Sequence, residues 1–179
     1  MKQFKDIDPL TVSLDPNLIA TVPDDEEATK NFYFLLIDNY IILATAKYFT
    51  NKRTGKSKWL HYQIEFPKNG LRWFLDTLED KFFKTAAEGG LPKGKFNDEG
   101  IVDGERLKLR RAFNADGEGG GGYAFITLDR FPEGRKVCKS YTFTDSLLFE
   151  HGMIDTMKEI AKKIGRSHTS VGKFLKKNS

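Results

Sequence analysis

The clearest pattern along the chain is an alternation of apolar and polar residues between Trp59 and Phe66. Leu60, Tyr62, Ile64 and Phe66 fall on one side, and the residues between them fall on the other. Because successive side chains of a strand point to opposite faces, this period of two predicts a half-buried β-strand.

Two further strands are expected before it. The segments Phe32–Ile37 and Tyr40–Leu43 are dense in aromatic and β-branched residues, and Asp38-Asn39 supplies turn chemistry between them. A helix over Ile41–Phe49 is the alternative. Residues 50–58 connect the second and third strands and form a basic hairpin loop.

The pattern then changes to a helical period between Pro67 and Ala87. Asn69 is a candidate cap, and Gly89-Gly90 marks the end of this segment. The spacing predicts an amphipathic helix packed on a sheet, with an inner face made of Leu71, Phe74, Leu75, Leu78 and Phe82.

A second block of the same order follows a linker rich in Gly, Pro and Lys, Gly89–Gly104. Strands are expected at Arg106–Arg110, Tyr123–Phe131 and Lys136–Thr144, with residues 132–135 as a turn. A helix capped by Thr144, Asp145 or Ser146 comes next, and its predicted inner face is Leu147, Ile154, Met157, Ala161 and Ile164.

These elements predict an α+β fold with antiparallel β-sheet(s) backed by two amphipathic helices, the strands-then-helix arrangement occurring twice. We expect one domain over residues 31–164, with halves at 31–88 and 105–164. Residues 1–30 hold three prolines and an acidic run, Asp24–Glu27, and are interpreted as an extended N-terminal arm. The acidic run is either a solvated loop or a phosphate mimic over a basic groove. Residues 165–179 form a basic C-terminal tail or the second helix of a helix-turn-helix.

Composition narrows the class of protein. The chain has 179 residues, 39% of them hydrophobic, and a single cysteine. These values argue against disorder throughout, a large multidomain enzyme and a disulfide scaffold. The most apolar stretch is too interrupted to span a membrane, so we expect a cytoplasmic protein without membrane contact. The net charge is +4, and the segment from Lys158 to Ser179 alone carries +6. This asymmetry is typical of proteins that contact nucleic acid or an acidic partner, and a solvated helix face gives the same count.

Few residues are suited to catalysis. His61, His151 and His168 have no neighbour at metal-ligand or nucleophile spacing. Gly117–Gly122 contains a G-x-G-x-x-G pattern, but a strand follows it where a helix is required, so a flexible hairpin tip is favoured. We therefore expect a protein that is not an enzyme and binds no cofactor or metal. The alternative is a metal-dependent nuclease using the carboxylates of Asp98, Glu99, Asp103 and Glu105.

The stronger pattern interleaves cations with aromatic rings, as in grooves that bind single-stranded nucleic acid. It comprises Lys47, Tyr48, Lys52, Arg53, Lys56, Lys58, Trp59 and His61, and a second basic strand adds Arg106, Lys108, Arg110 and Arg111. The competing interpretation is a solvated hairpin whose aromatic rings lie in the core.

The segment Ile160–Leu175 resembles the helix-turn-helix of transposases, resolvases and sigma-like factors. Ala161 stands where two helices approach closely and Gly165 where the turn is made. The resemblance implies that Ser167, His168, Thr169 and Lys173 sit at the DNA groove and that Arg166 approaches the backbone. A plain amphipathic helix followed by a basic tail explains the same residues.

The repeated order of strands and helix also resembles the Whirly and Pur-alpha-type single-strand binders, in which curved antiparallel sheets carry the nucleic acid and helices back them. We therefore expect a non-enzymatic single-stranded DNA-binding protein, an accessory factor of phage or plasmid replication or transcription. A duplex-DNA-binding helix-turn-helix regulator is the alternative. A homo-oligomer and contacts with replication or transcription proteins are compatible with either function.

Overall fold

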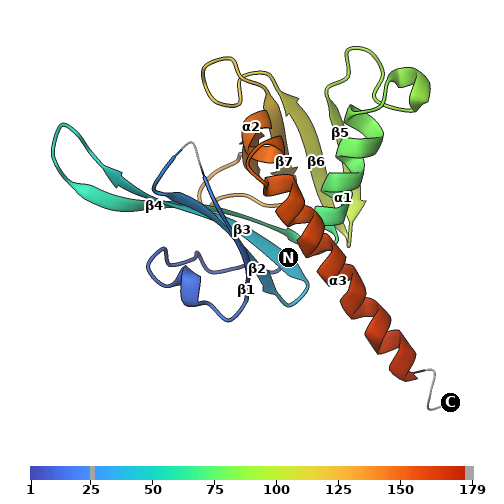
Figure 1. Cartoon of the computed structure of the whole chain (residues 1–179), viewed down its shortest axis with the longest axis horizontal. Helices are drawn as coiled ribbons and strands as arrows, with labels where there is room; N and C mark the ends of the chain where they lie inside the picture. Colours follow the sequence, from blue (N-terminus) through green and yellow to red (C-terminus); the bar gives the residue numbers. More distant parts are fainter. Residues whose placement is uncertain (25–26, 176–179) are drawn as a thin grey trace.

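The computed structural model describes residues 1–24 and 27–175, without the side chains of residues 166–175. The fold is α+β and consists of two four-stranded antiparallel sheets, each followed by helices (Figure 1). Sheet 1 has the order β1 (Leu18–Pro23), β2 (Lys30–Ile37), β3 (Tyr40–Thr50) and β4 (Ser57–Pro67). Sheet 2 has the order β5 (Asn97–Val102), β6 (Glu105–Ala112), β7 (Gly122–Thr127) and β8 (Lys139–Thr144). The predicted class and the repeated strands-then-helix order are confirmed.

Helices follow each sheet. Sheet 1 leads into α1 (Gly70–Thr77), which continues as a π-helical turn over Leu78–Phe82. Sheet 2 leads into α2 (Asp145–Phe149) and α3 (Met153–Leu175). Short 3-10 helices lie at Val12–Leu14 and Ala86–Glu88. The side chain of Thr144 accepts a hydrogen bond from the Leu147 amide at 3.1 Å, which confirms Thr144 as the cap of α2.

One hydrophobic core holds the two halves together. It contains Phe34 and Leu43 from sheet 1, Phe125 from sheet 2, Phe74 from α1 and Met157 from α3, all nearly inaccessible to solvent. The rings of Phe66 and Phe125 meet edge to face, with centroids 4.8 Å apart, and join the sheets directly. Because the core crosses from one half to the other, the two halves fold as a single body.

The first helix is shorter than the predicted Pro67–Ala87. Its expected inner positions Leu71, Phe74, Leu75 and Leu78 are buried, as predicted. The backbone and side chain of Thr85, however, both donate to Glu88, and this capping box starts the separate 3-10 turn at Ala86–Glu88. The helical region that begins at Gly70 therefore ends at Phe82.

The interpretation of residues 1–30 as an extended N-terminal arm is wrong. Leu18–Pro23 pairs with β2 as an edge strand, and the preceding residues cover the face of sheet 1 opposite the helices. Val12 is 3% exposed and packs with Phe4 and Ile7 against that face. Apolar residues at irregular spacing carry no periodic pattern, so the sequence did not indicate this contact.

The segment Gly89–Gly104, interpreted as a linker, also contains structure. Its second half forms β5, which pairs with β6 from Asn97–Arg110 to Val102–Glu105. The other expected strands are present, although β7 and β8 are shorter than predicted. The helix considered over Ile41–Phe49 is excluded, because these residues belong to β3.

Helix α3 runs without interruption from Met153 through Gly165 to Leu175 and extends away from the body (Figure 1). A helix-turn-helix requires a turn at Gly165, so that prediction is wrong, and the alternative of one amphipathic helix agrees with the structure. Glycine within a helix costs about 1 kcal/mol relative to alanine, which is too little to end a helix of this length. Neither α3 nor any other helix in the described ranges combines the length and apolar character needed to cross a membrane.

Candidate nucleic-acid interface

The hairpin of β3 and β4 is longer than the rest of sheet 1. Pairing between β2 and β3 ends at Lys30–Lys47, whereas β3 and β4 remain paired as far as Thr50–Ser57. Beyond Lys47, β3 therefore has β4 as its only neighbour strand in the described chain. We call this two-stranded extension together with its base, residues 47–61, the arm, and use the word from here on for this hairpin alone; it projects from the body in Figure 1.

Aromatic side chains lie on both faces of the arm. Tyr48 and Trp59 are cross-strand partners on one face, 45% and 36% exposed, and their ring centroids are 5.3 Å apart. Phe49 and Leu60 are exposed on the other face. The interpretation that placed these aromatic rings in the core is wrong, because the core ends where β2 ends. The rings are therefore accessible to a stacking ligand.

The tip of the arm is an ordered turn that carries cations. The Asn51 side chain accepts hydrogen bonds from the amides of Arg53 and Thr54 at 2.9 and 3.1 Å. Gly55 adopts φ +66°, which glycine accepts without steric cost. The turn thereby holds Lys52, Arg53 and Lys56 close together at the end of the hairpin.

Four cations of the arm are free of acidic partners. Within the described residues, no ion pair involves Lys52, Arg53, Lys56 or Lys58, and all four are exposed. Lys47 differs, because it pairs with Glu27 from the end of the predicted acidic run. His61 lies at the base of the arm, 3.8 Å from an Asp6 oxygen. The positive charge is therefore concentrated toward the tip.

The second basic strand is less available than its sequence suggests. On β6, Arg106 donates to Asp129 at 2.6 and 2.8 Å, and Lys108 donates to Glu99 at 2.8 Å. These hydrogen bonds hold the pKa values of Asp129 and Glu99 below their ordinary ranges, so both acids remain charged at neutral pH. Arg110 is exposed and has no ion pair within the described residues.

Arg111 does not belong to this surface. It lies on the opposite face of β6 from Arg110, where its guanidinium forms two 2.6 Å hydrogen bonds with Asp145 and lies over the ring of Tyr123. These contacts join β6 to the start of α2. Its assignment to the interface is therefore corrected to a structural role, since its guanidinium is paired with Asp145 inside the molecule.

The four carboxylates proposed for a nuclease do not converge. Glu99 is paired with Lys108, and Asp103 accepts hydrogen bonds from the Asn69 side chain. Glu105 is buried and forms two hydrogen bonds with Arg130 at 2.8 and 2.9 Å. Within the described residues no group of three or more His, Cys, Asp or Glu side chains is placed to hold a metal ion. The geometry thus removes the observation on which the nuclease alternative depended.

The predicted tail residues Arg166, Ser167, His168 and Lys173 have side chains outside those described. The preceding part of α3 presents Lys162 and Lys163 to solvent, and neither was predicted as an interface residue. Lys162 lies opposite the buried Ile160 and Ile164 on the helix, and this spacing would have indicated its exposure.

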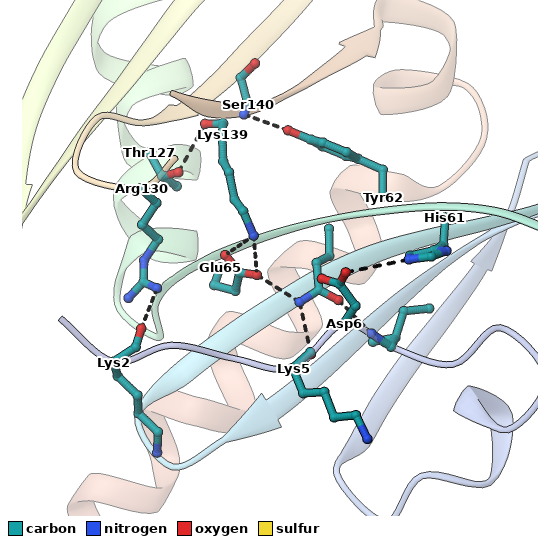
Figure 2. A network of polar contacts seen from close by, with 12 residues as sticks. Lys2, Lys5, Asp6, His61, Tyr62, Glu65, Thr127, Arg130, Lys139 and Ser140 are labelled. Atoms are coloured by element: carbon teal, nitrogen blue, oxygen red, sulfur yellow. Dashed lines mark hydrogen bonds and ion pairs between the residues drawn. The ribbon is translucent and has the colours of Figure 1, made fainter. Parts of the chain in front are cut away.

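A buried polar network joins sheet 1, sheet 2 and the N-terminal residues near the base of the arm (Figure 2). Lys139 of β8 donates to both oxygens of Glu65 of β4 at 2.8 and 3.0 Å. Arg130 donates to the Lys2 carbonyl at 2.9 Å. The first contact ties β4 to sheet 2 close to the base of the arm, and the second ties the N-terminal residues to the β7–β8 connection. Sequence reasoning missed them because the partners are far apart along the chain.

Comparison with protein-family models, curated protein sequences and solved structures gave no match to this chain.

Proposed function

We propose that this protein binds single-stranded DNA and catalyses no reaction on it. The observation that carries the proposal is the arm, where four unpaired cations and the exposed Tyr48–Trp59 pair occur together. Cations neutralise phosphates and release counterions, while aromatic rings stack on bases. Each of these contacts suits a flexible strand with exposed bases.

Accessible rings favour a single strand over a duplex. In a duplex the base faces are stacked on each other, so Tyr48 and Trp59 gain no stacking partner there. The continuous helix α3 also offers no turn to present a recognition helix to the major groove. An accessory role in phage or plasmid replication or transcription is part of this proposal, since both processes expose single strands.

The proposal also draws on the fold. Two antiparallel sheets, each followed by helices, agree with the arrangement of strands and helices that the Whirly and Pur-alpha-type resemblance implies. The nucleic-acid surface proposed here is nevertheless defined by this chain's own arm, and the neutralised cations of β6 contribute less to it.

The test is a titration of labelled 20-nucleotide single-stranded DNA, the matching duplex and the matching RNA, with and without magnesium. We expect the single strand to bind at least tenfold more tightly than the duplex, and all three nucleic acids to stay intact with magnesium. Equal binding of single strand and duplex, or no binding at all, contradicts the proposal. Reproducible cleavage that is lost in the Asp103→Asn variant would restore the nuclease alternative.

A further inference from the structure

A cleft of about 600 Å³ lies at the base of the arm. One wall is the N-terminal segment at Phe4 and Asp6, another is β4 at His61 and Tyr62, and the third is the β7–β8 connection at Phe131 and Glu133. Its volume falls within the range of about 300–1,000 Å³ that is typical of small-molecule sites. It is therefore large enough for a nucleoside.

The charge of the cleft disfavours phosphate. Lys139 is the one lysine or arginine among the described residues that line it, and its ammonium group already donates to both oxygens of Glu65 at 2.8 and 3.0 Å. Asp6 and Glu133 contribute two exposed carboxylates. An anionic group placed here would meet like charge without a free cation, so the phosphates of a bound strand remain on the arm.

The cleft instead suits a planar group with N–H donors. Phe131 is 49% exposed and offers a ring face. Tyr62 is held in place because its hydroxyl accepts a hydrogen bond from the Ser140 amide at 3.0 Å, as Figure 2 shows. Carboxylates accept hydrogen bonds from exocyclic amino groups of bases, for example N4 of cytosine. Thymine carries a carbonyl oxygen at the same position and has no amino group to donate.

The cleft continues the surface of the arm. His61 follows Trp59 by two residues on the same face of β4, so a strand stacked on Trp59 and Tyr48 passes the cleft mouth at its next bases. We propose that the cleft takes one unstacked nucleobase bearing an exocyclic amino group and that it gives this protein a preference for cytosine over thymine. The inference rests on the proposed function and specifies its base preference.

The experiment compares labelled dC12 and dT12 at pH 7.5 and fixed salt, using the full chain. Both are pyrimidine strands of equal charge, so their affinity ratio isolates the base. We expect dC12 to bind about fivefold more tightly or better, as one carboxylate–amino contact would produce. The variant D6A/E133A should bring the ratio close to one. The control variant E79A/E118A removes two exposed carboxylates elsewhere, has the same net charge and should keep the ratio.

Each outcome has a distinct meaning. Equal binding of dC12 and dT12 by the unmodified protein overturns the base preference and leaves single-strand binding standing. Retention of the ratio in D6A/E133A, or its equal loss in E79A/E118A, overturns the assignment to the cleft. Failure to bind either oligonucleotide overturns the proposed function itself, and the base preference with it.

Discussion

At the scale of single residues, the Tyr48–Trp59 pair is the feature most specific to a stacking ligand. Both rings are partly exposed and contact each other across the hairpin. In the Y48A/W59A variant we expect single-strand affinity to fall by about 1–3 kcal/mol for each base that no longer stacks on a ring, with stability nearly unchanged. Fluorescence anisotropy measures the first quantity and urea denaturation the second.

Phe83 and Phe149 provide the matched control for that variant. Their rings are also exposed, and their centroids are 5.8 Å apart. Phe83, however, directly follows the helical region that ends at Phe82, and Phe149 is the last residue of α2 and contacts Tyr123 of β7. The F83A/F149A variant should bind single strands as the unmodified protein does. Equal losses of affinity in the two variants would show that exposed rings in general, and not the arm, account for binding.

Glu99 and Asp129 neutralise two cations of β6, Lys108 and Arg106. In the E99Q/D129N variant, Lys108 and Arg106 lose their charged partners and become available to phosphates. We expect tighter single-strand binding and a salt dependence steeper by up to about 0.7 for each additional phosphate that is neutralised. Isotherms at several salt concentrations measure the change. Unchanged affinity and slope would exclude the face of sheet 2 that carries Arg106 and Lys108 from the interface.

At the scale of elements, α3 tests the two interpretations of the basic C-terminus. Residues 166–179 carry four cations, and α3 continues through Gly165 without a turn. Deleting residues 166–179 should weaken binding to single strands and duplexes by a similar factor, because such cations contact phosphates without reading bases. Loss of a duplex preference alone, with single-strand binding intact, would contradict this and support recognition by the tail.

The local hydrophobic pattern of the sequence predicted most helices and strands. The features that it did not predict depend on contacts between residues far apart along the chain. The alternation in β4 and the helical spacing around Leu71 and Phe74 depend on neighbours within a few residues, so the sequence reveals them. The same alternation does not tell whether a face is covered, and it therefore left the exposure of Trp59 undecided. The pairing of Arg106 with Asp129, 23 residues away, depends on register and turn length, which the sequence pattern does not specify.

At the scale of the whole molecule, the N-terminal segment completes a second small core. Phe4, Ile7 and Val12 cover Tyr33 and Leu35 on the outer face of sheet 1. Deleting residues 1–14 should lower the free energy of unfolding by at least about 3 kcal/mol, since each apolar side chain contributes about 1.5–3 kcal/mol on burial. Urea denaturation measures this loss. Unchanged stability would mean that the segment is only loosely attached.

The most direct test of the central claim, that the arm binds the phosphates of a single strand, is the salt dependence of binding. The variant with Lys52, Arg53, Lys56 and Lys58 changed to Ala is compared with one in which Lys81, Lys84, Lys93 and Lys95 are changed to Ala, so that both lose the same charge. The plot of log K against log salt concentration should flatten by up to about 0.7 for each phosphate that the arm variant no longer neutralises. The control variant should keep the slope of the unmodified protein. An unchanged slope in the arm variant, or the same flattening in both, would contradict the account.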